Sequence, residues 1–391
     1  MGQGDYMATR ELGIILHGAT GGICSFQHLR NSLIPIIGEG GLEVGGERIL
    51  PKLLLVGRSE ERLAKLAAVH GGLDWTTDLD AALGNEAYPV FFDAVSTHLR
   101  VDVLKRAIAA GKHIYTEKPV APTVKEGMEL LGAAQAKGLK HGAVEDKLFL
   151  PGFLKLRRVV ESGFLGRIIG FQINFGWWVF DGIEAECQRP SWNYRKAGGG
   201  GLISDMHPHW RYIVEGTLGP IARVAALAWT GQTERADEAG ARFRVDVEDN
   251  AHTLLELESG ARGAILSSWS TRVRREDLVT FQVDGTGGSA VAGLRRCWKQ
   301  AAGDTPLVRG FLMGRDADTM DVSVDYRENW QEEPDPAPYK NPYRYGWERF
   351  IRHVVRDEPF YADLTAGIRD VRLAEACLQS AQEGGWVDMK A

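Results

Sequence analysis

The chain has 391 residues, and its 46 lysines and arginines against 52 aspartates and glutamates give a formal net charge of −6 at pH 7. Hydrophobic residues make up 44% and charged residues 25%, which is ordinary for a globular protein and excludes a largely disordered one. The negative charge offers no broad cationic field, so we expect neither nucleic acid nor a membrane surface as a partner. The length predicts two domains or one large one.

Cysteine usage favours a reducing compartment. The four cysteines, Cys24, Cys187, Cys297 and Cys377, are each at least 80 residues from the next, and no Cys/His cluster occurs. We therefore expect neither a disulfide framework nor a zinc site. The polar N-terminus and the absence of any run of 18 apolar residues predict no secretory signal and no membrane span, so the predicted location is the cytoplasm.

The first third of the chain alternates apolar strands with helical segments. The predicted strands cover residues 12–16, 53–56, 90–95 and 113–115, and the predicted helices cover residues 60–69, 101–110 and 124–136. This alternation predicts an α/β domain over residues 1–145, built on a doubly wound parallel sheet. Residues 35–51 contain five glycines and two prolines, and we interpret them as an insertion between the first helix and the second strand.

The pattern changes in the second half, where strands follow one another without helices between them. A predicted helix at 153–161 precedes predicted strands at 168–178, 222–230, 250–257, 263–270 and 278–284. Such runs predict an α+β domain over residues 146–391, built on a large, mostly antiparallel open sheet. The proline-rich stretch 332–342 is interpreted as a surface excursion, and predicted helices at 347–355 and 365–382 return to pack on the core.

A glycine-rich turn, His17-Gly18-Ala-Thr20-Gly21-Gly22, follows the first predicted strand and opens a helix. Such a turn lets backbone N–H groups approach a dinucleotide pyrophosphate. The spacing is not G-x-G-x-x-G, so a merely tight strand–helix turn is an equal alternative.

The ends of the next two strands carry further candidates for cofactor contact. Many NAD sites have an acidic residue after the second strand, whereas this chain has Gly57-Arg58-Ser59, which suits the 2′-phosphate of NADP. Alternatively, Arg58 stacks on adenine or is simply solvated. Ser96, Thr97 and His98 follow the third strand and are candidates for the same cofactor.

The tripeptide Glu117-Lys118-Pro119 follows the fourth predicted strand. A lysine at the carboxyl end of a parallel strand points toward the crevice where such sheets bind ligands. As an isolated tripeptide it has little meaning, since most such lysines are solvated, so the inference depends on its place in the strand–helix array.

A second motif runs from Gly198 through four consecutive glycines to Asp205 and His209. The glycines would let a backbone approach a ligand closely. Asp205 and His209 are four residues apart, so on a helix they share a face and could meet one substrate. No third ligand is nearby, so no metal is expected. A capped helix with satisfied polar residues is the alternative.

This ordered pair of motifs, over nearly the whole chain, resembles the Gfo/Idh/MocA oxidoreductases. The resemblance implies an N-terminal Rossmann dinucleotide-binding domain, a C-terminal domain for substrate binding and oligomerisation, and NAD or NADP as cofactor. It also implies that Lys118 contacts the nicotinamide ribose and the reacting oxygen, that His209 is the acid/base, and that Asp205 holds substrate hydroxyls. The Gly18–Gly22 turn and the 35–51 insertion depart from the family pattern.

The segment before the glycine run suggests a carbohydrate substrate. Aromatic and polar side chains alternate there, which suits a sugar ring, and several cations add local positive charge. The candidates for substrate contact are Lys147, Trp178, Arg189, Trp192, Tyr194, Arg195 and Lys196, with Arg211 as a further cation. We expect a sugar, and the cations favour an anionic one such as a uronate or sulfosugar. Alternatively, the cations pair with carboxylates such as Glu184 and Glu186 or lie at a subunit interface.

Three functions remain open on these residues. The first is an NAD(P)-dependent sugar dehydrogenase, which we expect to be a dimer or tetramer assembled through the C-terminal sheet. The second is a glycosidase that works by transient oxidation, with Tyr115 or Tyr194 as an extra acid/base group. The third is an inert dinucleotide-binding sensor, against which the presence of Lys118, Asp205 and His209 argues.

Overall fold

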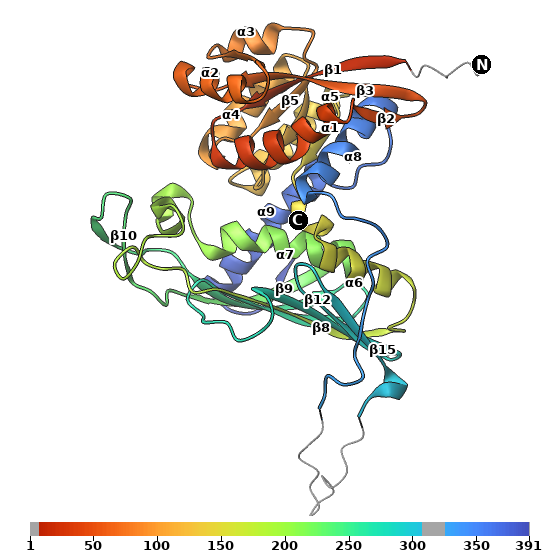
Figure 1. The fold of residues 1–391 in the computed structure, drawn as a ribbon. Coiled ribbons are helices and arrows are strands. Elements are labelled where there is room, and N and C mark those ends of the chain that lie inside the picture. Colours follow the sequence, from red (N-terminus) through yellow and green to blue (C-terminus); the bar gives the residue numbers. More distant parts are fainter. Residues whose placement is uncertain (1–7, 307–324, 391) are drawn as a thin grey trace, which may run out of the picture. The chain divides into compact units, whose positions relative to one another are not determined.

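The structure is a computed structural model that describes residues 8–306 and 325–390 (Figure 1). The chain folds into two compact units, and both are discontinuous in sequence. The first unit contains the chain up to Phe149 together with Trp192–Tyr212 and Lys340–Ala376, and the second contains Leu150–Ser191, Ile213–Tyr339 and the chain from Cys377. A single division between residues 145 and 146 is therefore too simple, because two later segments belong to the first unit.

The first unit is built on a seven-stranded sheet. Its strands are β1 (Thr9–His17), β2 (Leu42–Val44), β3 (Glu47–Val56), β4 (Asp74–Thr76), β5 (Val90–Asp93), β6 (His113–Thr116) and β7 (His141–Ala143). Their order is β2-β3-β1-β5-β6-β7, with β4 also on β3, and every pair is parallel except β2 with β3. The expected doubly wound parallel sheet is confirmed.

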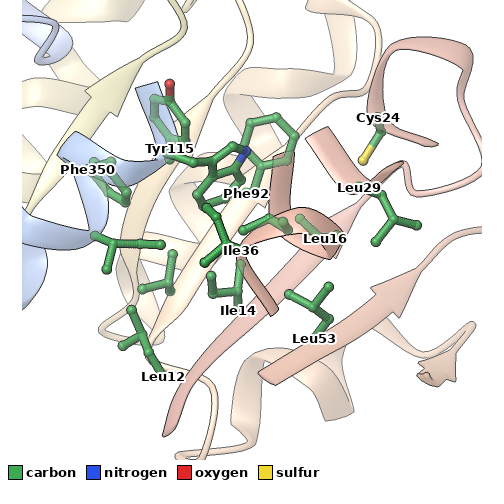
Figure 2. Packing of buried hydrophobic residues seen from close by; sticks show 14 of the residues in the cluster. Leu12, Ile14, Leu16, Cys24, Leu29, Ile36, Leu53, Phe92, Tyr115 and Phe350 are labelled. Atoms are coloured by element: carbon green, nitrogen blue, oxygen red, sulfur yellow. The ribbon is translucent and has the colours of Figure 1, made fainter. Parts of the chain in front are cut away.

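Helices cover both faces of this sheet. The helical segments that lie wholly or mostly in this unit are the π-helix η1 (Cys24–Leu33), α1 (Ile34–Gly38), α2 (Glu60–Val69), α3 (Leu79–Gly84), α4 (Thr97–Ala109), α5 (Val124–Ala136), α8 (Pro342–Arg356) and the short turns η2 (Asp146–Phe149), η3 (Ser191–Tyr194) and η4 (Lys196–Gly198). Successive strand residues point to opposite faces, so Ile14 packs with Leu29 and Phe350 on one side (Figure 2), while Ile15 packs with Leu104 on the other. Burial on both faces explains why these strands are continuous apolar runs.

The glycine-rich segment 35–51, interpreted as an insertion between the first helix and the second strand, has regular secondary structure. The helix that begins at η1 continues through Pro35 into α1, because proline is tolerated in the first turn of a helix segment. Residues from Glu47 onward already belong to β3, which pairs antiparallel with β2 around Gly45 and Gly46. The segment thus forms a helix end and a hairpin that extends the sheet edge.

The second unit is built on a nine-stranded sheet in the order β17-β16-β15-β14-β8-β13-β12-β9-β18. Its strands are β8 (Ile168–Gly176), β9 (Ile221–Trp229), β12 (Asn250–Leu257), β13 (Arg262–Ser268), β14 (Val279–Gly285), β15 (Gly288–Ala292), β16 (Cys297–Ala301), β17 (Gln331–Glu332) and β18 (Val387–Asp388), and β10 (Glu234–Ala236) and β11 (Arg242–Arg244) form a separate hairpin. Among the strands within residues 8–306 and 325–390, only the β8–β13 pair of this sheet is parallel, so the large, mostly antiparallel sheet is confirmed.

Three longer helices accompany the second unit. They are α6 (Pro151–Glu161), which packs against β15 and β16, α7 (Leu202–Leu218) and α9 (Leu364–Glu383), and a short turn η5 (Ala302–Asp304) follows β16. Both α7 and α9 begin in the first unit and end in the second. Among residues 8–306 and 325–390, no helix combines the length and apolar character that crossing a bilayer requires.

Candidate functional site

The glycine turn joins β1 to η1 at the carboxyl edge of the parallel sheet. Gly18 has φ +76°, and the N–H groups of Gly18 and Ala19 donate to the Val56 carbonyl at 3.0 and 3.1 Å. A Cβ at Gly18 would lie 3.2 Å from the backbone of Ala94, so the chain itself requires glycine there. At Gly22, by contrast, a Cβ would meet no atom within 4 Å.

This arrangement fits a dinucleotide. No side chain caps the helix at Ile23, and helix N-termini of this kind can hold phosphate on their backbone N–H groups, although the Ser25 N–H already donates to the Gly21 carbonyl at 2.9 Å. Gly22 leaves room for a pyrophosphate to approach the backbone. The hairpin of β2 and β3 lies beyond this turn in sequence and does not interrupt it.

A second arginine joins the residues at the end of β3. The Ser59 hydroxyl accepts the Arg62 N–H at 3.4 Å and caps α2, while the Arg62 guanidinium donates to the Thr20 carbonyl at 2.8 Å. Arg58 is exposed. Two cations, Arg58 and Arg62, thus lie on the segment where an NAD site would usually carry an acid. Sequence reasoning missed Arg62, although its place in the first turn of α2 was a usable signal.

Ser96, Thr97 and His98 lie where β5 gives way to α4. Ser96 and His98 are exposed and Thr97 is half-buried, and Ser96 makes no side-chain cap to α4. Because β5 is the neighbour of β1, this edge lies next to the glycine turn. The three residues are therefore at the strand ends where such sheets bind dinucleotides.

A buried ion pair between Asp93 and Arg100 connects two backbone segments near Lys118. Asp93, fully buried at the end of β5, accepts the Arg100 Nε–H at 3.0 Å and contacts His17 Nδ1 at 3.0 Å. Arg100 also donates to the carbonyls of Val95, at 2.6 Å, and Pro119. One guanidinium therefore links the end of β5 to the turn that carries Lys118.

Lys118 follows β6 and is paired with Asp205 at the start of α7. Its Nζ lies 2.9 Å from the Asp205 Oδ1 and 3.0 Å from the Asp205 carbonyl oxygen. The two side chains keep 16% and 20% of their surface exposed. The structure thus brings together the two motifs that lie 87 residues apart in the sequence. The Lys118–Pro119 peptide is cis.

His209 lies one helical turn after Asp205 and contacts two residues that the motif did not include. Its Nδ1 is 2.5 Å from the Tyr212 hydroxyl, which donates to the Asp146 Oδ1 at 3.1 Å. His209 is 5% exposed. Asp146 lies in η2 and Tyr212 on α7. The Asp146 carboxylate, the Tyr212 phenol and the His209 imidazole thus form a hydrogen-bonded chain, here called the acid/base line.

This line sets the histidine tautomer. Burial, followed by the nearby charges of Asp146 and Asp370, raises the pKa of Tyr212 well above its ordinary value, so the phenol keeps its proton. Because that proton is donated to Asp146, the phenol oxygen accepts from His209 Nδ1–H. A neutral His209 then carries its lone pair on Nε2, the arrangement that a general base needs.

One expectation about the same helix was incomplete, because Arg211 was counted as a free cation. Arg211 is buried and donates to Asp370 at 2.6 Å and to Glu145, so its charge is already compensated and does not add to a positive patch. His207 is fully buried, and burial lowers its pKa to about 3. Lys147, a substrate candidate, is half-buried with its Nζ 3.4 Å from Asp146.

The glycine run packs against the chain itself. A Cβ at Gly200 would lie 2.4 Å from the Asn193 carbonyl oxygen, and the Gly201 N–H donates to the same oxygen at 2.9 Å. Close approach is therefore the right reason for at least Gly200, but the partner is the turn at Trp192–Tyr194 and not a ligand.

The remaining candidates in the first unit differ in exposure. Tyr194 is fully buried, whereas Trp192 is half exposed, Lys196 is exposed and Arg195 is intermediate. Tyr115 is also fully buried, and burial followed by the Glu117 charge raises its pKa well above the ordinary value.

Trp178 and Arg189 belong to the second compact unit. The Arg272 guanidinium lies 3.8 Å from the centroid of the Trp178 ring, and Arg189 stacks over Trp269 at 4.3 Å. Both predicted side chains thus already take part in cation–π pairs. Among residues 8–306 and 325–390, no three His, Cys, Asp or Glu side chains are grouped so as to hold a metal ion.

Two family models match the chain. Residues 51–143 match an oxidoreductase family with an NAD-binding Rossmann fold, and residues 153–291 match a GFO/IDH/MocA C-terminal domain. The expected order of the two domains is confirmed.

Curated relatives and solved structures agree with these models. D-xylose dehydrogenase of Paenarthrobacter nicotinovorans is 42% identical over 381 residues, or 96% of this chain and 97% of the relative. Levoglucosan dehydrogenase of Pseudarthrobacter phenanthrenivorans is 26% identical over 262 residues, or 63% and 66% of the two chains. A structure of a levoglucosan dehydrogenase with NADH and levoglucosan has the same fold, with a TM-score of 0.79 at 21% identity over 98% of this chain and all of that one. The chain therefore belongs to the Gfo/Idh/MocA oxidoreductase family.

Proposed function

We propose that this protein is a nicotinamide-dependent sugar dehydrogenase that oxidises a hydroxyl group of a free aldose. The observation that carries the proposal is the Lys118–Asp205 pair, which lies at the carboxyl edge of a dinucleotide-binding sheet and one helical turn from His209. These three residues provide a cation for the reacting oxygen, an acceptor for a neighbouring hydroxyl, and a base.

The chemistry follows from the two hydrogens that leave the substrate. The nicotinamide, when bound, supplies the acceptor for the hydride that leaves carbon. The hydroxyl proton passes to His209 Nε2, and the line through Tyr212 to Asp146 stabilises the imidazolium that forms. Two N–H groups of Lys118 donate to Asp205, and we assign the third to the reacting oxygen, where a fixed cation stabilises developing alkoxide charge.

We infer a neutral aldose as the substrate class. The relative named D-xylose dehydrogenase supports a free pentose or hexose. Arg211 is compensated by two carboxylates, and Arg189 is stacked on Trp269. Fewer cations are therefore available to bind a uronate or sulfosugar than the number in the sequence suggested. An anionic sugar is the second candidate, carried by the exposed Lys196 and the half-buried Arg195.

The test is a panel of neutral pentoses and hexoses, matched uronates and sulfosugars, and the corresponding glycosides, each with NAD⁺ and with NADP⁺. Reduced nicotinamide is read by absorbance in stoichiometric amounts. The proposal expects cofactor reduction with neutral aldoses and no release of aglycone from glycosides. Aglycone release without net reduction would replace it by the glycosidase, and dinucleotide binding with no turnover on any sugar would replace it by the sensor.

Arg195 and Lys196 provide the charge test. Losing a charge-assisted hydrogen bond to an anion typically costs about 1.5–3 kcal/mol, so neutralising either residue would raise KM for an anionic sugar by at least about tenfold if they bind its charge. We expect equal, small effects on matched neutral and anionic sugars.

We also propose that the protein is a homo-oligomer, a dimer or tetramer, assembled through the sheet of the second unit. Leu227 on β9 and Leu254 on β12 are 69% and 54% exposed, and the register places both strands side by side. Sizing of the wild type against Leu227→Asp tests this. The cytoplasm remains the predicted location, since all four cysteines are free thiols.

A further inference from the structure

A buried histidine lies in the helix that follows the glycine turn, and the chemistry proposed above does not use it. His28 is 1% exposed and belongs to η1, a π-helix. Long π-helices are rare, and π-type turns are frequently found at functional sites. The His28 ring packs on Phe92 with 4.2 Å between ring centroids.

The two nitrogens of His28 have different partners, and these partners fix its tautomer. The Trp347 indole Nε1–H, on α8, donates to His28 Nδ1 at 3.0 Å. An indole nitrogen is a donor only, so Nδ1 accepts and the proton of the neutral ring is on Nε2. His28 Nε2 is 2.8 Å from Glu117 Oε1, so it donates to that carboxylate.

Glu117 connects His28 to the backbone of Lys118. Its second oxygen, Oε2, accepts the backbone N–H of Lys118 at 3.1 Å. The Glu117 side chain is 9% exposed, so a donor lost from it would not be fully replaced by water. The direction of the carboxylate, and with it the Lys118 backbone, thus depends on the hydrogen bond from His28.

Helix α8, which carries Trp347, is hydrogen-bonded to the hairpin of β2 and β3. Arg352 and Arg356 of α8 donate to the carbonyls of Glu43, at 2.8 Å, and Gly45, at 2.9 Å. Arg344 pairs with Glu39 just before the hairpin. These contacts fix α8, and α8 presents Trp347 to His28.

We propose that His28, in its Nε2–H tautomer, is a positioning residue for Lys118, acting through Glu117 and held by Trp347. The proposal rests on the proposed function only in that Lys118 binds the reacting oxygen. Its tautomer is a property of the fold and can be measured without any substrate.

The first experiment compares three substitutions in η1 by steady-state kinetics and thermal unfolding. His28→Leu removes the donor to Glu117, and since a misplacement of about 1 Å can cost about 10²-fold in rate, we expect kcat to fall by about that factor, with KM changed by less than about threefold. His28→Gln carries one amide donor and one acceptor, and we expect it to restore kcat to within about tenfold of wild type.

Ser32→Ala is the matched control for structural damage. Ser32 is fully buried in the same helix and donates to the Gln27 carbonyl at 2.7 Å, without contacting Glu117. We expect it to lower the unfolding temperature and leave kcat unchanged. A loss of kcat in Ser32→Ala that matches His28→Leu at equal destabilisation would overturn the positioning role, as would wild-type kcat in His28→Leu.

The second experiment measures the tautomer in protein labelled with ¹⁵N-histidine. We expect an unprotonated Nδ1 and a protonated Nε2 for His28 at neutral pH, and loss of this fixed pattern in Trp347→Phe. Protonation on Nδ1 overturns the inference. If instead Lys118→Met retains activity while the tautomer is as expected, the proposed function fails and the His28–Glu117–Lys118 connection stands as structure alone.

Discussion

Two ion-pair clusters meet the same helix, α7, and they differ in how much of their charge remains accessible. Lys118 and Asp205 form a single pair with 16% and 20% of their side chains exposed, whereas Arg211, between Glu145 and Asp370, is at most 5% exposed. Both clusters come from the same stretch of motif. The comparison teaches that a cation near a binding motif can bind a ligand only where neighbouring carboxylates do not already accept all of its N–H groups.

The sharpest way to break this comparison is to remove each cation in turn. Lys118→Met removes a fixed donor to the reacting oxygen, and we expect kcat to fall about 10³-fold while the fold survives, because the partly exposed Asp205 is solvated. Arg211→Met leaves two buried carboxylates without their partner, and we expect a loss of about 3–5 kcal/mol in unfolding free energy. Sugar oxidation rates and urea unfolding of both variants measure this; a near wild-type rate in Lys118→Met would contradict it.

The second prediction concerns the acid/base line on the same helix. His209→Ala removes the base, and we expect kcat to fall by about 10²-fold or more, equally for neutral and charged sugars. Tyr212→Phe removes the hydroxyl that accepts from His209 Nδ1–H and donates to Asp146, and we expect a fall of about tenfold, as for the loss of a typical hydrogen bond of about 1.4 kcal/mol. An effect of His209→Ala on KM alone would return this histidine to a binding role.

His207 sharpens the contrast between two histidines on one helix. Its pKa is lowered to about 3 by burial, so the folded protein keeps it neutral while the unfolded chain protonates it below its ordinary value near 6.5. The unfolded state then binds more protons, and stability falls as pH drops from 6.5 toward 3. At pH 5 the expected loss is about 2 kcal/mol relative to pH 8. Urea unfolding at both pH values, with His207→Gln as comparison, checks this; parallel pH dependences of the two proteins would refute it.

The smallest expected effect concerns the exposed cations near the cofactor turn. Arg58 is exposed, whereas Arg62 is held by Thr20. We expect NADP(H) to bind at least as tightly as NAD(H), and Arg58→Ala to weaken NADP(H) about tenfold with little change for NAD(H). Arg62→Ala is expected to weaken both, since it loosens the turn. Calorimetric titration decides; tighter NAD(H) binding that neither variant alters would show that this corner does not select the cofactor.

Much of the fold was predictable because its determinants are local. The strands β1, β3 and β5 are buried on both faces, so each contains a short continuous apolar run. The glycines and prolines of segment 35–51 indicated an insertion but not its structure, in which Pro35 lies in the first turn of α1. The pairing of β2 with β3 is local, because Gly45 and Gly46 form the two-residue turn of a hairpin, and this turn signal was available in the sequence.

Only those site residues whose positions follow from their spacing within one helix or strand could be predicted from the sequence. Asp205 and His209 share a helix face because they are four residues apart, and Lys118 follows from its strand. The contact of Tyr212 with Asp146 joins residues 66 apart in sequence, so no motif contains it. Arg211 was misjudged for the same reason, since its carboxylate partners, Glu145 and Asp370, come from distant segments.

Gly18 and Gly22 also lie in one turn, but the fold requires glycine at only one of these two positions. Gly18 is required by its own positive φ and by the backbone of Ala94, whereas nothing within 4 Å of a Cβ forbids a side chain at Gly22. In a duplicated copy of this gene that no longer bound a nucleotide, folding would preserve Gly18 and leave Gly22 to drift. A bulky side chain at Gly22 would therefore leave the fold intact and fill the space beside the start of the helix, so we expect it to weaken dinucleotide binding without unfolding the protein.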